Sequence, residues 1–166
     1  MARQFDARHL SSTKNTQVQM TNWYEILVPD MADLTIMVRN CTLPEISTPA
    51  VELPFGNSKA KVPGQVEFGD GSMTFMDAIK KDIEKQLVEW QSKVYDVKTG
   101  KMGWVDEFKK DITVTQYGPD GTCERVWTFE GAWPSQISYG EMSGESSDVK
   151  QIQVTMSYDR AYRSDI

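Results

Sequence analysis

Alternating apolar and polar residues mark a hairpin in the C-terminal half of the chain. Residues 112–117 (ITVTQY) alternate, and residues 124–130 (ERVWTFE) alternate back. Between them lies the sequence GPDG at 118–121, with proline and glycine at the positions that a tight turn favours. The pattern predicts two antiparallel strands joined by this turn.

A final strand is predicted over residues 151–158 (QIQVTMSY). Its residues separate into an apolar and a polar set, as on a strand with one buried face. The apolar set is Ile152, Val154, Met156 and Tyr158. The polar set is Gln153, Thr155, Ser157 and Asp159.

Shorter strand patterns lie in the N-terminal half. Residues 23–28 (WYEILV) and 34–41 (LTIMVRNC) are rich in the aromatic and β-branched residues that favour strands. Residues 66–68 and 73–75 are two further short candidates, on either side of a Gly-Asp-Gly turn at 69–71.

The stretch between residues 42 and 66 has a different character. Several prolines and glycines interrupt it, and these residues disfavour a regular central strand. The same stretch carries Val51, Leu53 and Phe55, whose apolar side chains need a partner. Two interpretations stay open, a long loop folded back on its own core or an arm that packs on another subunit.

One helix is predicted over residues 77–95, with Asp77 as a candidate N-cap and Thr74 as a competing one. Apolar residues recur there every three or four positions and form one stripe. The stripe consists of Ile79, Ile83, Leu87, Trp90 and Val94. One long helix among several short strands predicts a mainly β (α+β) fold. We expect two antiparallel sheets that form a sandwich or partial barrel with one flanking helix.

Length and composition favour one domain behind a polar N-terminal arm. The chain has 166 residues, of which 39% are hydrophobic, enough for one buried core. Residues 1–20 are polar and without periodicity. We therefore expect a flexible arm over 1–20 that orders against a neighbouring subunit, followed by a single β domain over 21–166.

The charge of the chain argues against nucleic-acid binding. Its formal net charge is −6 and its pI is about 4.8, whereas phosphate binding needs clustered lysine and arginine.

No apolar run approaches the ~20 residues of a membrane helix. The first residues also lack the apolar stretch of a secretory signal. We expect no membrane anchor.

Residues that could carry catalysis or hold a metal are few. The single histidine, His9, falls in the N-terminal arm. Cys41 and Cys123 are far apart in the sequence and suggest reduced, buried thiols, with a single disulfide as the alternative. Paired carboxylates such as Glu141 and Glu145 are explained more simply as solvated surface. The sequence predicts no cofactor, no metal site and no enzymatic activity.

A series of landmarks resembles the tail tube proteins of contractile-tailed bacteriophages. In chain order they are a tryptophan late in the helix, a glycine-containing loop, a Lys-Asp pair before the hairpin, an Asp-Gly turn, a Gly-Ala-Trp-Pro segment and a closing strand that ends YDRAY. These are Trp90, residues 99–103, Lys110 and Asp111, Asp120 and Gly121, residues 131–134 and residues 158–162. The resemblance extends from about residue 20 to the C-terminus, and its most specific part is the Gly-Ala-Trp-Pro segment.

This resemblance implies a structural subunit of the virion tail that is assembled in the host cytoplasm. Proteins of that family form hexameric rings that stack into a hollow tube, and four strands of each subunit contribute to a continuous inner β-barrel. The implied partners are further copies of the chain, a sheath protein, a tape-measure protein and baseplate proteins. DNA would pass through the lumen without specific binding, and an acidic chain suits a wall that does not attract phosphates.

Two alternatives stay open on the sequence alone. One is the tube protein of a secretion system or extracellular contractile injection device, and the other is a small ligand-binding β-barrel.

The candidates for ring stacking are Leu53, Phe55, Asn57 and Lys59. The candidates for facing the lumen are Gln65, Glu67, Gln153, Thr155, Ser157 and Asp159. For the lumen set, an ordinary solvated sheet face is the competing interpretation.

Overall fold

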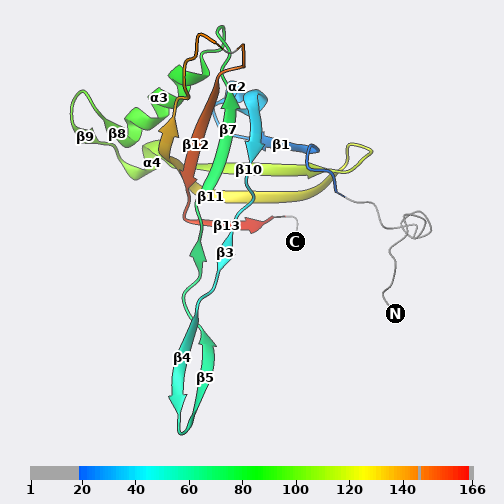
Figure 1. Ribbon diagram of the computed structural model, residues 1–166, viewed down its shortest axis with the longest axis vertical. Helices are drawn as coiled ribbons and strands as arrows, with labels where there is room; N and C mark the ends of the chain where they lie inside the picture. The colour runs from blue at the N-terminus through cyan, green and yellow to red at the C-terminus, as the bar shows by residue number, and fades with distance from the viewer. Residues whose placement is uncertain (1–18, 146, 165–166) are drawn as a thin grey trace.

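One long strand, β11 (Cys123–Ser138), belongs to two sheets that run crosswise to each other (Figure 1). It changes direction at Gly131, whose φ is 65°, a conformation that favours glycine. A Cβ at this position would lie 2.3 Å from Oδ2 of Asp159. The computed structural model describes residues 19–145 and 147–164.

The first part of β11 lies in what we call the transverse sheet. Its strand order is β1 (Tyr24–Leu27), β10 (Lys110–Tyr117), β11 and β13 (Arg160–Arg163), all antiparallel. The β10–β11 turn lies at residues 118–121, where the amide of Gly121 donates to the carbonyl of Gly118 at 3.0 Å. The predicted hairpin is therefore confirmed, but its second strand continues through the Gly-Ala-Trp-Pro segment.

The last part of β11, residues 133–138, lies in the axial sheet, whose strands follow the long axis of the molecule (Figure 1). Its strand order is β11, β12 (Gln151–Ser157), β7 (Gly71–Met76) and β2 (Val38–Cys41), again antiparallel. The strand predicted at the end of the chain is thus β12, in the middle of this sheet.

The core lies between the inner faces of the two sheets and beneath the helix α3 (Ile83–Val94). Alternate residues of β12 point into it, as the sequence pattern predicts. The largest fully buried side chains include Trp90, Phe75, Ile26, Leu34, Ile83, Leu87, Ile112 and Ile152. Trp90 also donates a hydrogen bond from Nε1 to the carbonyl of Phe108 at 2.7 Å, so both its apolar ring and its polar group are satisfied.

The helix begins later than its apolar stripe predicts. Asp82 is the N-cap, with its Oδ1 accepting from the amide of Lys85 at 3.1 Å, so the prediction of Asp77 as the cap is wrong. Asp77 instead binds Lys150 through both its backbone amide and its carboxylate. Ile79 lies before the helix and is fully exposed. Ile83, Leu87 and Trp90 of the stripe are buried in the core.

Residues 34–41 were expected to form one strand, and only the last four do so. A short helix, α2 (Ala32–Met37), precedes β2. Leu34 is completely buried in the core, and Oγ1 of Thr35 accepts from the amide of Val28 at 3.3 Å. Tertiary burial therefore overrides the strand preference of the β-branched residues here.

Residues 42–66 form mainly a projecting hairpin, and not a long loop or a central strand of a sheet. They contain β3 (Ile46–Ser47) and a projecting hairpin of β4 (Ala50–Phe55) and β5 (Ser58–Pro63), and β6 (Glu67–Phe68) follows. In a two-stranded ribbon each strand has one unpaired side, so the prolines within β4 and β5 need not interrupt the pairing. Pro49 and Pro63 lie at the base of this isolated hairpin, where it joins the rest of the chain.

The remaining elements lie beside the C-terminal end of α3. They are a small hairpin of β8 (Tyr95–Asp96) and β9 (Lys101–Met102) and the short helix α4 (Val105–Phe108). The expected fold class is confirmed: the protein is mainly β, with antiparallel sheets and α3 on one flank. The transverse and axial sheets, which β11 joins, do not close into a barrel. The helices α2 and α4 add to the one helix that was predicted. Most of the expected N-terminal arm, including His9, lies outside the described residues.

Two residues of the predicted stripe provide a stability test. Leu87→Ala should lower the free energy of unfolding by about 2–5 kcal/mol, because Leu87 is completely buried. Ile79→Ala should change it by no more than about 0.5 kcal/mol, because Ile79 is fully exposed. Urea unfolding of dilute protein measures both. Equal losses in the two variants would contradict the late start of α3.

Candidate functional site

The outward face of the axial sheet presents uncharged polar side chains. Residues directly opposite each other in an antiparallel sheet share a face, and two cross-strand rows can be followed across this one. The first row is Gln136, Thr155 and Ser72. The second row is Ser138, Gln153, Thr74 and Asn40. All seven are amides or hydroxyls, so the two rows contain hydrogen-bonding groups and no charged side chain, although Thr74 is itself buried.

The transverse sheet presents charge on its outward face. Arg160 forms an ion pair with Glu130, and the hydroxyl of Tyr162 donates to the same carboxylate at 2.9 Å. Both hydrogen bonds lower the pKa of the Glu130 carboxyl below its ordinary value. The hydroxyl of Tyr117 donates to Glu25 at 2.6 Å. The two sheets therefore present chemically different outer surfaces.

The axial sheet ends in two unpaired strand edges. Within the described residues, no strand pairs with the outer side of β2 or with the outer side of β11 at residues 133–138. Because four antiparallel strands make up the sheet, these two edge strands run in opposite directions. An unpaired edge is a template for another strand.

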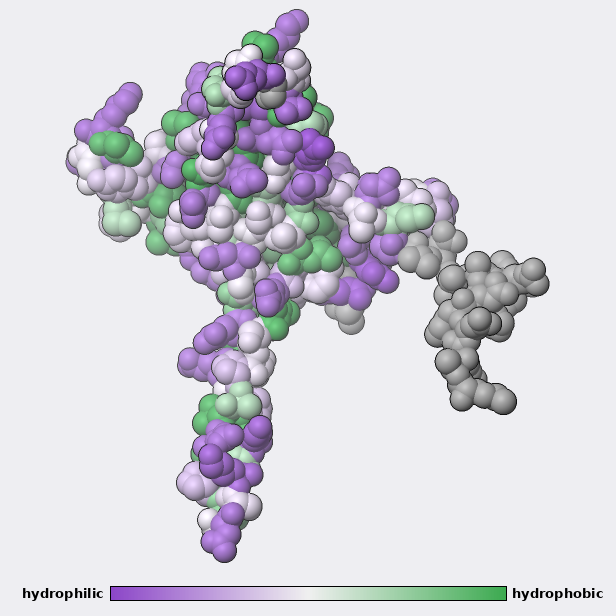
Figure 2. Space-filling view, viewed as in Figure 1, coloured by the Kyte–Doolittle hydropathy of each residue, from purple (hydrophilic) through white to green (hydrophobic). Residues whose placement is uncertain are grey.

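The β4–β5 hairpin projects from the body along the long axis of the molecule (Figures 1 and 2). Its residues are all exposed, including Leu53 and Phe55, the latter with 76% of its surface accessible. Asn57 lies in the turn, and Lys59 forms an ion pair with Glu52 at 2.7 Å. The four ring-stacking candidates thus lie together at the tip. Apolar side chains without a partner in their own chain indicate a contact surface.

The six residues predicted to face the lumen lie in different parts of the structure. Gln153, Thr155 and Ser157 lie on one face of β12. Gln65 and Glu67 lie at the base of the projecting hairpin, outside the axial sheet. Asp159 lies past the end of β12, where its carboxylate pairs with Lys109 at 2.7 Å.

Sequence reasoning missed the neighbours of the β12 residues. These are Asn40, Ser72, Thr74, Gln136 and Ser138. Polar residues alternate with apolar ones over 71–76 and again over 135–138, and this signal could have identified four of the five. Strand order, which no local pattern contains, is what brings them onto one surface.

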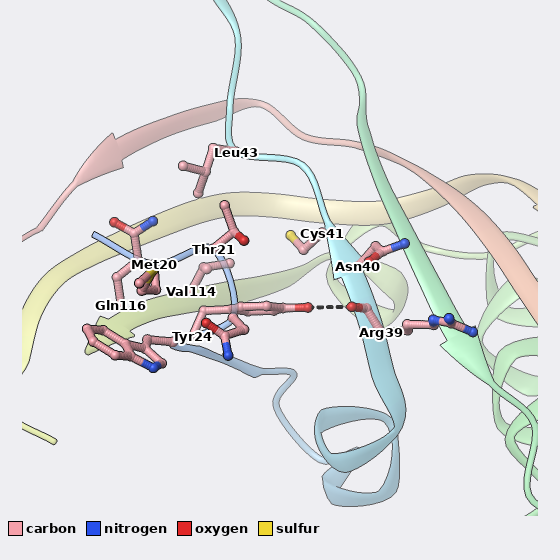
Figure 3. A pocket seen from close by; sticks show the side chains of 11 residues that line it. Met20, Thr21, Tyr24, Arg39, Asn40, Cys41, Leu43, Val114 and Gln116 are labelled. Carbon is pink, nitrogen blue, oxygen red and sulfur yellow. Dashed lines mark hydrogen bonds between the residues drawn. The ribbon is translucent and has the colours of Figure 1, made fainter. Parts of the chain in front are cut away.

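A shallow pocket lies between β1 and β2 (Figure 3). The side chain of Tyr24 crosses the pocket, and its hydroxyl donates to the carbonyl of Arg39 at 2.7 Å. This hydrogen bond links β1 of the transverse sheet to β2 of the axial sheet without strand pairing. Cys41 lines the pocket, and burial raises the pKa of its thiol to about 12. Cys123 is exposed, contrary to the expectation of two buried thiols, and both cysteines are free.

The sequence model of the phage tail tube protein family matches residues 4–164. The chain belongs to this family. Its relatives include the tail tube protein gp19 of Enterobacteria phage T4, with 26% identity over 133 residues, which are 76% of this chain and 80% of the T4 protein. The resemblance to tail tube proteins of contractile-tailed phages is therefore confirmed, and the chain is a structural component of the virion tail.

Solved structures share the fold of this tail tube protein. The anti-feeding prophage cap that terminates its tube has a TM-score of 0.75 at 18% identity, with 99% of each chain covered. The sheath–tube complex of the extracellular contractile injection system PVC, in its extended state, has a TM-score of 0.71 at 18% identity, with 96% of this chain and 97% of that chain covered. Because the identity to both structures is only 18%, this similarity shows a shared fold and nothing further.

The tail tube protein offers little for small-molecule chemistry. No group of three or more His, Cys, Asp or Glu side chains that could hold a metal occurs among the residues described. No helix in that part of the chain is long and apolar enough to cross a membrane. Side chains fill the space between the sheets. The family to which the chain belongs is one of structural proteins.

Proposed function

We propose that this tail tube protein forms hexameric rings that stack into a hollow conduit, with the axial sheet lining the lumen. The two rows of uncharged polar residues on the outward face of that sheet, bounded by two unpaired edges, carry the proposal. DNA is the cargo, and the subunit has no catalytic role or cofactor.

Ring closure follows from the two edges of the axial sheet. Residues 133–138 of β11 and the strand β2 run in opposite directions, so β11 of one subunit can pair antiparallel with β2 of the next. A head-to-tail contact of this kind closes into a ring when the rotation between subunits permits it. Closure also removes exposed strand edges that would otherwise promote aggregation. Each subunit would then contribute four strands to one continuous inner barrel.

The chemistry of the proposed lumen suits the passage of DNA. Lysine or arginine on the wall would bind phosphates with release of counterions and slow the DNA. The two rows of amides and hydroxyls present neither lysine nor arginine. Gln153, Thr155 and Ser157 belong to this wall in the proposal. The net charge of −6 would be carried by other surfaces of the subunit.

The projecting hairpin supplies the contact between rings in this proposal. It extends along the same direction as the strands of the axial sheet (Figure 1), which would be roughly the direction of the tube axis. Leu53, Phe55, Asn57 and Lys59 at its tip would reach the next ring. Burial of a phenylalanine side chain contributes about 1.5–3 kcal/mol, and six copies per ring multiply this contribution. The N-terminal arm, residues 1–20, would order against a neighbouring subunit at the same time.

The remaining partners are assigned by analogy with related machines. One structural neighbour comes from a sheath–tube complex and another from a baseplate, which supports contacts with a sheath and a baseplate. A tape-measure protein would occupy the lumen before DNA does. An injection-device tube is the second candidate, favoured by the same neighbours, whereas the match to the T4 protein favours a phage tail.

Labelling of an introduced cysteine tests the lumen. In a Cys123→Ser background, Thr155→Cys in assembled tubes should react with a small maleimide but not with a large polyethylene glycol maleimide, which the narrow conduit excludes. Dissociated subunits should react with both reagents. Cys41 should contribute little background, because burial raises the pKa of its thiol to about 12.

The matched control is Val97→Cys on the exposed loop between β8 and β9. It should react with both reagents in tubes and in subunits. Equal reaction of Thr155→Cys with the large reagent in both states would place the axial sheet outside the lumen.

The substitution Phe55→Asp tests the stacking contact. It should leave a folded subunit that forms rings but no long tubes, because a charge replaces an apolar side chain at the contact. Circular dichroism measures folding, and negative-stain electron microscopy measures tube length. Val97→Asp, an equally exposed apolar-to-acid change away from the hairpin, should form normal tubes. Normal tubes from Phe55→Asp would refute the role of the tip.

A further inference from the structure

The end of the molecule opposite the hairpin is formed by two loops, which we call the apical surface (Figure 1). One loop, residues 77–82, connects β7 to α3, and the other, whose described residues are 139–145 and 147–149, connects β11 to β12. The second loop is long for a compact domain, and long loops of this kind are commonly functional. Hydrophilic side chains dominate this end in Figure 2.

The longer of the two apical loops is acidic. Residues 139–149 contain the carboxylates of Glu141, Glu145 and Asp148 and no lysine or arginine. All three side chains are exposed, and none forms an ion pair within the described part of the chain. A cluster of unpaired like charges costs free energy through repulsion unless a partner of opposite charge neutralises it.

Apolar side chains accompany these carboxylates. Ile79 is fully exposed, Met142 is 86% exposed and Val149 is 58% exposed. Acidic and apolar groups on one surface indicate a partner that is both basic and apolar.

Both apical loops are anchored to the body at their bases. The amide of Asp77 donates to the carbonyl of Lys150 at 3.1 Å, and the ammonium of Lys150 lies 3.3 Å from the Asp77 carboxylate and also pairs with Glu84. The hydroxyl of Tyr139 donates to Gln91 at 3.0 Å. These contacts occupy Lys150. In the shorter loop Lys81 pairs with Asp33, which leaves Lys80 as its remaining exposed cation, against the three carboxylates of the longer loop.

The hairpin at the other end has the complementary character. It carries Lys59 and Lys61 against a single carboxylate, Glu52, which Lys59 already binds. Lys61 takes part in no ion pair within the described residues. Its exposed apolar side chains are Val51, Leu53, Phe55 and Val62.

We infer that the apical surface of one subunit receives the β4–β5 hairpin of a second copy in the next ring. The inference rests on the proposed stacking and adds its acceptor, an acidic and apolar surface at the opposite end of the same chain. A contact between opposite ends of identical molecules does not close on itself when it is repeated along one axis. It therefore gives the tube a direction, with every hairpin pointing the same way.

Charge reversal tests the acceptor. Glu141→Lys combined with Asp148→Lys should raise the protein concentration needed for tube formation by about tenfold, because each exposed ion pair is weak but recurs in every subunit of the ring. Lys59→Glu combined with Lys61→Glu should have a similar effect. Joining all four substitutions in one chain should restore tube formation to near the wild-type concentration. Sedimentation with electron microscopy measures this concentration.

The matched control reverses two carboxylates elsewhere, Glu89→Lys with Asp106→Lys, which are exposed on α3 and α4. It should stack like the wild type. Wild-type stacking by the apical variant, or no recovery in the fourfold variant, would overturn the acceptor while tubes of the unmodified protein still supported the proposed function. Failure of the unmodified protein to form rings or tubes would instead overturn the proposed function itself.

Discussion

The corner at Gly131 turns β11 from one sheet into the other, and the positions of the remaining surfaces follow from it. The glycine amide donates to Oδ1 of Asp111 at 2.9 Å, and the amide of Asp159 donates to the carbonyl of Glu130 at 3.0 Å. Lys109 then holds the Asp159 carboxylate at 2.7 Å. A side chain at position 131 would collide with that carboxylate, which lies 2.3 Å from an ideal Cβ, so the backbone packs closely only because the residue is glycine.

This corner separates two surfaces that need different chemistry. Because the sheets run crosswise, the charged network around Glu130 and Arg160 and the uncharged rows around Thr155 face different directions. The same arrangement directs the hairpin along the axial strands, where it reaches past the body of its own subunit (Figure 1).

Local patterns in the sequence predicted the elements whose residues face the core in a regular period. The β10–β11 hairpin and β12 belong to this group, as does α3 from Ile83 onward. The pattern failed at Ile79, because an exposed apolar residue before a helix looks the same as the first residue of its stripe. It failed at residues 32–37 because burial of Leu34 decides their conformation.

The surfaces for assembly were only partly predictable for a related reason. Alternation in β12 showed that one face is polar, and the apolar residues of 42–66 indicated a partner outside the core. Neither signal contains strand order, which places Ser72, Gln136 and Thr155 in one row. The acidic loop at 139–149 has no period at all, and its position opposite the hairpin emerges only from the fold.

The most direct test is a cryo-electron microscopy reconstruction of tubes assembled from this chain. The account predicts a continuous inner barrel in which residues 133–138 of β11 pair antiparallel with β2 of the neighbouring subunit, with Thr155 facing the lumen. A reconstruction in which the transverse sheet lines the lumen, or in which β2 and β11 of adjacent subunits do not pair, would contradict it.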